Sequence, residues 1–166
     1  MNRISNLAVT VVSLLILTVA PVGNAVGQEK ARQASDIERV NAASQVFIAA
    51  ISARDIRAME KLWARESYVT FIGPLSTTVV VGWDGVMKAW EMRFNQFERV
   101  TISLAESHVH TNGKIAWSVG VEKVQLLRKD GGTLSFDAFV TNVLEKRDSR
   151  WLLVSHHATP VFREAR

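Results

Sequence analysis

The chain has 166 residues, of which 48% are hydrophobic and 22% are charged, and it contains no cysteine. These values fit one ordinary globular domain, and they exclude a disordered tail, a collagen-like repeat, a disulfide framework and a thiolate metal site. The 20 Lys and Arg against 16 Asp and Glu make the chain mildly basic, and the basic residues are scattered rather than grouped with aromatic residues. No nucleic-acid-binding surface is therefore expected.

The N-terminal segment has the layout of a secretory signal. The apolar run from Leu7 to Ala20 carries no charge and follows Arg3, and small residues permit cleavage after Ala25 or Gly27. The run is shorter than the roughly 20 apolar residues that span a bilayer. We therefore expect a secreted or periplasmic protein without a stable membrane anchor. Its expected parts are a signal peptide at 1–27, a short N-terminal extension at 28–35 and one folded domain at 36–162.

Three helices are predicted in the first half of the domain. Ser35-Asp36-Ile37-Glu38 is a capping-box pattern, and apolar residues then recur at helical spacing up to Ala53. Asp55 can cap a second, shorter helix. Asp84 can cap a third helix, whose buried stripe has the spacing i, i+3, i+7, i+10 and consists of Met87, Trp90, Phe94 and Phe97.

Six strands are predicted around and after the third helix. Two short ones, at Tyr68–Ile72 and Thr77–Val81, are each stopped by a glycine. After Val100 the apolar period changes from 3.6 to 2, and three turn signals at 112–113, 130–132 and 148–149 divide the rest into four strands. Helices followed by an antiparallel sheet predict an α+β fold with the helices against one face.

The turns also predict a register for the sheet. Loops of two, three and two residues in that order place His108 opposite Trp117, Val121 opposite Thr141, and Thr141 opposite His156. A slip of one residue would exchange His156 with His157. One face is then predicted to carry Ile102, Leu104, Glu106, His108, Trp117, Val119, Val121, Phe139, Thr141, Val143, Val154 and His156.

The opposite face is predicted to be apolar as well. It would carry Val124, Val140, Leu144, Trp151 and Leu153 beside small residues of the neighbouring strands. Exposed apolar patches beyond a few hundred Å² usually mark contacts. We therefore expect a homodimer packed sheet against sheet, with Trp151 and Leu153 among its buried contacts. The alternative is that terminal segments of the same chain cover them.

Four stretches together resemble a known family. They are Phe47–Asp55 with Leu62-Trp63, Gly82–Trp90, His108–Gly113, and Phe139–Thr159. Their order and spacing are similar to the SnoaL-like branch of the nuclear transport factor 2-like superfamily, which includes ketosteroid isomerase, scytalone dehydratase and the association domain of calcium/calmodulin-dependent kinase. The resemblance implies a cone in which three N-terminal helices and a curved, mostly antiparallel six-stranded sheet enclose a pocket, commonly in a dimer.

The resemblance argues against steroid isomerase activity. In ketosteroid isomerase the pocket holds a general-base Asp, an oxyanion Tyr and a protonated Asp. The matching positions of this chain carry Phe71, Phe47 and Thr141. Because neither phenylalanine can donate or accept a proton, that reaction is not expected.

The candidate catalytic residues Glu106, His108 and His156 lie on the predicted pocket face. Glu106 beside His108 could orient that imidazole for proton transfer, and His156 could act as a base or donate to a ligand. A metal site is not expected, because two strands, about 14 Å, separate His108 from His156, and no cofactor is indicated. We expect the ligand-binding residues to be Trp63, Phe71, Trp90, Trp117, Thr141 and His157.

Two functions follow from these expectations. The first is a small-molecule pocket for an apolar or ring-bearing ligand, for binding alone or for isomerisation, dehydration or cyclisation by proton transfer. The second is a non-enzymatic oligomerisation or accessory domain. A cavity of a few hundred Å³ that exposes His156 or His157 would favour the first, and a closed core would favour the second.

Overall fold

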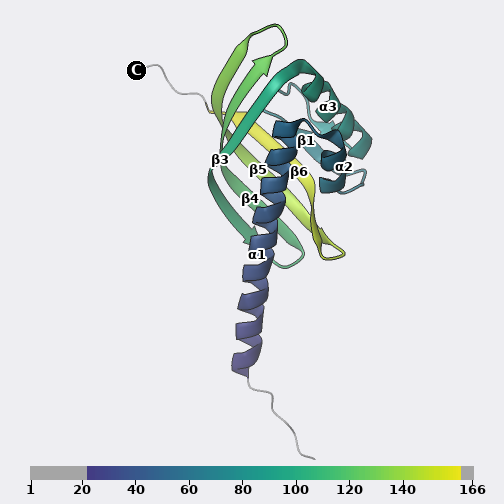
Figure 1. Cartoon of the computed structure of the whole chain (residues 1–166). Coiled ribbons are helices and arrows are strands. Elements are labelled where there is room, and N and C mark those ends of the chain that lie inside the picture. Colours follow the sequence, from purple (N-terminus) through teal and green to yellow (C-terminus); the bar gives the residue numbers. More distant parts are fainter. Residues whose placement is uncertain (1–21, 162–166) are drawn as a thin grey trace, which may run out of the picture.

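The computed structural model describes residues 22–161, so most of the predicted signal peptide lies outside the described residues. The elements are α1 (Val22–Ala53), α2 (Ile56–Leu62), β1 (Thr70–Ile72), β2 (Val80–Val81), α3 (Trp83–Gln96), β3 (Phe97–Thr111), β4 (Ile115–Arg128), β5 (Thr133–Arg147) and β6 (Arg150–Pro160). One sheet has the order β2-β1-β6-β5-β4-β3 and is antiparallel except between β1 and β6. The predicted α+β architecture is confirmed, and Figure 1 shows α1 running across one face of the curved sheet.

Helix α1 begins earlier than predicted. It starts at Val22 rather than at the capping box of Ser35, because the intervening residues include good helix formers such as Gln, Glu, Lys and Ala and no proline. Residues 25–34 are exposed, and this part of α1 extends beyond the sheet (Figure 1). Asp36, which the capping box placed at the start of the helix, lies inside α1 and is buried. Its Oδ1 accepts a hydrogen bond from Lys146 Nζ at 2.6 Å.

The two shorter helices differ in how they begin. Asp55 caps α2 as predicted, since its side chain accepts the backbone N–H of Ala58 at 3.0 Å. The N-cap of α3 is Gly82, with a positive φ of 84° and no side-chain cap, so Asp84 lies in the first turn instead. Within residues 22–161, no helix combines the length and the apolar character needed to cross a membrane.

Two of the three hairpin loops are longer than predicted. Thr111 pairs with Ala116, because the Asn112 side chain accepts the N–H groups of Lys114 and Ile115 and so closes a wider loop. The β4–β5 loop is also longer, at 128–132. The β5–β6 turn has the predicted two residues at 148–149, both with positive φ.

Of the three register shifts among the described strands, two are β-bulges that change which candidate site residues share a face. In β3 the register shifts between Leu104 and Glu106, so Leu104 points to the helix-covered side while Glu106 and His108 point to the other. Gly120 opposes this bulge, and a Cβ there would lie 2.1 Å from the Glu106 carbonyl oxygen. In β6 a second bulge at Val154 pairs His156 with Asn142 and His157 with Thr141. A bulge adds one residue to one strand and so inverts the alternation beyond it.

The predicted dimer face is the protein's own core. Trp151 and Leu153 are only 5% and 4% exposed, and Ala64 donates its N–H to the Leu153 carbonyl. The face was assigned to the outside because the inner row of β4 is the less apolar one, with Ala116, Ser118, Gly120 and Glu122. The outer face presents Trp117, Val119 and Phe139, which are 41%, 45% and 58% exposed.

Candidate functional site

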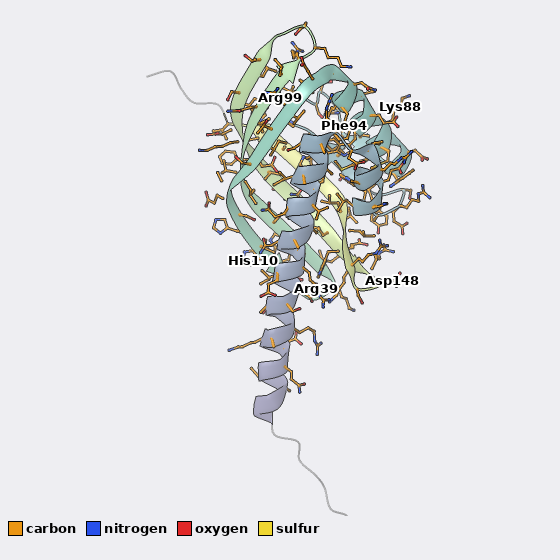
Figure 2. All side chains as sticks on the ribbon, in the orientation of Figure 1. Arg39, Lys88, Phe94, Arg99, His110 and Asp148 are labelled. Carbon is orange, nitrogen blue, oxygen red and sulfur yellow. The ribbon has the colours of Figure 1, made fainter. Side chains whose placement is uncertain are left out.

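A cavity of about 410 Å³ lies between α3, the β1–β2 loop and the inner face of the sheet. Figure 2 places Lys88 and Phe94 of α3 at the same end of the molecule as Arg99, away from His110 and Asp148. The walls of the cavity are mainly apolar, which is usual for a ligand pocket. The polar side chains among its lining residues are those of Ser76, Thr77, Thr78, Lys88, Arg93, Gln96, Glu122 and His156.

His156 is held in an aromatic cage on the cavity wall. It is 3% exposed, and Phe71 stacks on it with ring centroids 5.5 Å apart, while Phe47 and Trp90 lie close on other sides. Its Nδ1 lies 2.7 Å from Asn142 Oδ1, so Nδ1 donates and Nε2 carries the free lone pair. Burial, with the charges of Arg93 and His157, lowers the pKa of His156 to about 3. The imidazole is therefore neutral near pH 7.

Glu122 is a buried carboxyl that sequence reasoning missed. It lies on the inner row of β4 and is 4% exposed, yet it borders the cavity. Burial raises the pKa of Glu122 to about 7, and within residues 22–161 no hydrogen bond or ion pair to it is found. The available signal was that every other member of its row, from Ala116 to Leu126, is uncharged. The carboxyl can exist in both protonation states near neutral pH.

Arg93 brings a positive charge to the β1–β2 end of the cavity. Its Nη2 donates to Ser76 Oγ at 2.6 Å, and its guanidinium lies 4.5 Å from the centre of the Phe71 ring. Burial lowers the pKa of Arg93. Among residues 22–161, no carboxylate forms an ion pair with it. Sequence reasoning missed this residue because an arginine on a helix is ordinarily solvated.

Three of the predicted site residues line the cavity, namely Phe71, Trp90 and His156. Trp63 is instead a core residue, 2% exposed, whose ring packs edge-on against Phe71. Trp117, Thr141 and His157 lie on the outer face, where His157 Nε2 is 3.0 Å from the Thr159 hydroxyl. Their expected place in the pocket is wrong, because the predicted pocket face of β4 and β5 is the outer one.

Glu106 and His108 form a pair, but not in the cavity. His108 Nε2 lies 2.7 Å from Glu106 Oε1 on the outer face, and the two side chains are 65% and 60% exposed. An exposed ion pair of this kind contributes little to the stability of the fold. The expectation that they share a face with His156 is wrong, because the β3 bulge reverses them. In the described part of the chain, no three His, Asp or Glu side chains are placed to hold a metal ion.

A family model described as the SnoaL-like domain matches residues 40–163, and the chain belongs to this family. Solved structures with the same fold include a proposed dehydratase of the NTF2-like family from Streptomyces avermitilis. It has a TM-score of 0.71 and 23% identity, and the match covers 78% of this chain and 99% of that one.

A further solved structure and a curated relative are described as two different kinds of protein. A proposed aromatic ring hydroxylase from Novosphingobium aromaticivorans has a TM-score of 0.71 and 14% identity, over 78% of this chain and 91% of that one. The F-box protein SKIP8 of Arabidopsis thaliana is 28% identical over 113 residues, which are 68% of this chain. The match spans about half of that relative, 46% of its length. At these identities the likeness to the two solved structures establishes the fold alone.

Proposed function

We propose that the chain binds a small, largely apolar, ring-bearing molecule in the cavity and exchanges a proton with it through Glu122. The observation that carries the proposal is a buried carboxyl, without a hydrogen-bond or ion-pair partner among residues 22–161, on the wall of a cavity of about 410 Å³. A general acid or base works best when its pKa lies near the operating pH. With a pKa of about 7, Glu122 can remove a proton from one ligand atom and return it to another.

This chemistry needs no electron transfer. Isomerisation moves a proton and a double bond within one molecule. Dehydration couples proton transfer to the loss of water, and cyclisation couples it to the closing of a ring. His156 supports such a step as a neutral acceptor through Nε2, since Asn142 fixes its Nδ1 hydrogen. The relative described as a proposed dehydratase is consistent with this class of reaction.

We expect the ligand-binding half of the proposal to appear as a thermal shift. A ligand at 100 times its Kd raises the free energy of unfolding by about 2.7 kcal/mol, so a collection of ring-bearing compounds should contain some that raise Tm. Ala89→Phe narrows the cavity and should abolish the shift, whereas Ala53→Phe at an exposed helix end should not. A shift of equal size in both variants would mean that the ligand binds elsewhere.

Proton transfer by Glu122 is tested on any compound that raises Tm in this screen. Glu122→Gln keeps the shape of the side chain and removes the exchangeable acid, so turnover should fall by about 100-fold or more while binding persists. Unchanged turnover would leave Glu122 without a catalytic role.

We also propose that the protein is exported and forms a homodimer. Export rests on the apolar run of Leu7–Ala20, and protein recovered outside the cytoplasm should begin near Val26 or Gln28 by mass spectrometry. Recovery of the mature soluble protein with Met1 intact would contradict cleavage. The dimer is now proposed through the outer face around Trp117, Val119 and Phe139, which is also the surface that a non-enzymatic oligomerisation domain would use.

A further inference from the structure

The cavity has an uncompensated positive charge. Its charged lining side chains are Lys88, Arg93 and Glu122. Burial holds the pKa of Glu122 at about 7, so its carboxyl carries at most part of a negative charge near neutral pH. Lys88 is exposed to water, but Arg93 is partly buried and has no carboxylate partner within residues 22–161. A partly buried cation without a counter-ion is costly unless a ligand supplies one.

The surroundings of Arg93 fix its guanidinium in one place. The group lies over the Phe71 ring, donates to Ser76 Oγ at 2.6 Å and donates to the Ala89 carbonyl at 3.4 Å. Gly73 makes room for it, because a Cβ on Gly73 would lie 3.1 Å from both Nε and Nη2 of Arg93. Two of the five guanidinium N–H groups are used by these hydrogen bonds, and the rest stay available as donors.

Ser76 provides a second donor at the same point. Its Oγ accepts hydrogen bonds from Arg93 Nη2 and from the Gly73 N–H, at 2.6 and 2.8 Å. Both lone pairs of the hydroxyl are then occupied, so its hydrogen is free to donate to another group. Because Ser76 and Arg93 both line the cavity, an oxygen anion there would receive charge-assisted hydrogen bonds from two side chains.

We propose that the ligand is an organic acid, whose carboxylate binds to Arg93 and the Ser76 hydroxyl while its ring occupies the apolar part of the cavity. The apolar part includes Phe94 of α3, Phe97 of β3, and Val124 and Leu126 of β4. This inference rests on the proposed small-molecule function and specifies the chemical class of the ligand.

The test compares two probes of the same shape, 2-naphthoate and 2-naphthamide, by calorimetric titration at about pH 6, where the carboxylic acid is ionised and Glu122 is mostly protonated. The intact domain should bind the carboxylate at least tenfold more tightly than the amide. Arg93→Met should remove this preference and leave the affinity for 2-naphthamide within about twofold, since it deletes a charge-assisted pair and keeps the apolar stem. Lys88→Met is the matched control, and it should retain most of the preference.

Ser76→Ala keeps the proposal testable if Arg93→Met does not fold. It should weaken 2-naphthoate severalfold and leave 2-naphthamide unchanged. Equal binding of the two probes, a preference that survives in Arg93→Met, or a preference that Ser76→Ala leaves undiminished would overturn the acid assignment while the small-molecule function stands. If neither probe binds, the small-molecule function itself fails for ligands of this size, and the acid assignment fails with it.

Discussion

Leu153→Glu is expected to unfold the protein rather than to dissociate a dimer. Leu153 is 4% exposed and belongs to the core, where its carbonyl also accepts the Ala64 N–H. The substitution removes buried apolar surface and places a carboxylate among apolar core residues, at a cost of about 4 kcal/mol or more. Because domains are stable by only about 5–15 kcal/mol, thermal denaturation followed by circular dichroism should show a large fall in Tm or no cooperative transition.

Phe139→Glu is the matched substitution on the other face of the sheet. Phe139 is 58% exposed, so the fold should lose no more than about 1 kcal/mol. If the outer face joins two copies, sedimentation at tens of micromolar should show a dimer for the unmodified protein and a monomer for this variant. A native Tm for Leu153→Glu would contradict the placement of the core, and a monomeric unmodified protein would refute the dimer.

Stability is expected to peak in mildly acidic solution, because Glu122 and His156 act in opposite directions. Burial raises the pKa of Glu122 from 4.5 to about 7, so the stability from its protonated form is present below pH 4.5 and is lost as the pH rises through 7. For Glu122 alone the loss is about 3 kcal/mol, and His156 offsets the part that falls between pH 4.5 and 6.5. Burial lowers the pKa of His156 from 6.5 to about 3, so the stability from its neutral form is present above pH 6.5 and is lost as the pH falls through 3.

Urea denaturation across this pH range separates the two groups. Glu122→Gln should flatten the decline on the alkaline side and leave the acid side unchanged. His156→Gln should flatten the acid side, although it costs stability at every pH because the aromatic cage loses its stacked ring. An alkaline decline of the same size in Glu122→Gln would show that another group is responsible.

The order and type of the elements were predictable because they depend on local patterns. The Asp55 cap before an apolar helix acts within a few residues, and so do the turn signals at 112–113, 130–132 and 148–149 between alternating strands. The faces of the sheet were not predictable in this way. The alternation of apolar and polar residues along a strand predicts their faces only as far as the next β-bulge. No sequence pattern indicates the bulges at Ala105 and Val154.

The candidate site shows the same division. His156 was predicted on the inner face, but only because the error in the β5 face and the unforeseen β6 bulge compensate each other. Glu122 and Arg93 were missed because a charged side chain in a strand or helix is ordinarily exposed. Their significance comes from α3 and the β1–β2 loop, which close over the sheet and which no local pattern brings there.

The bulge at Val154 makes strand length, rather than residue type, decide which histidine faces inward. A relative that lacked one residue at this point would present the neighbour of His156 to the aromatic cage and move the other ring to the outer surface. Adjacent histidines can therefore exchange places among homologues without any substitution. An ungapped alignment of such a relative with this chain through β6 would pair residues that occupy opposite sides of the sheet.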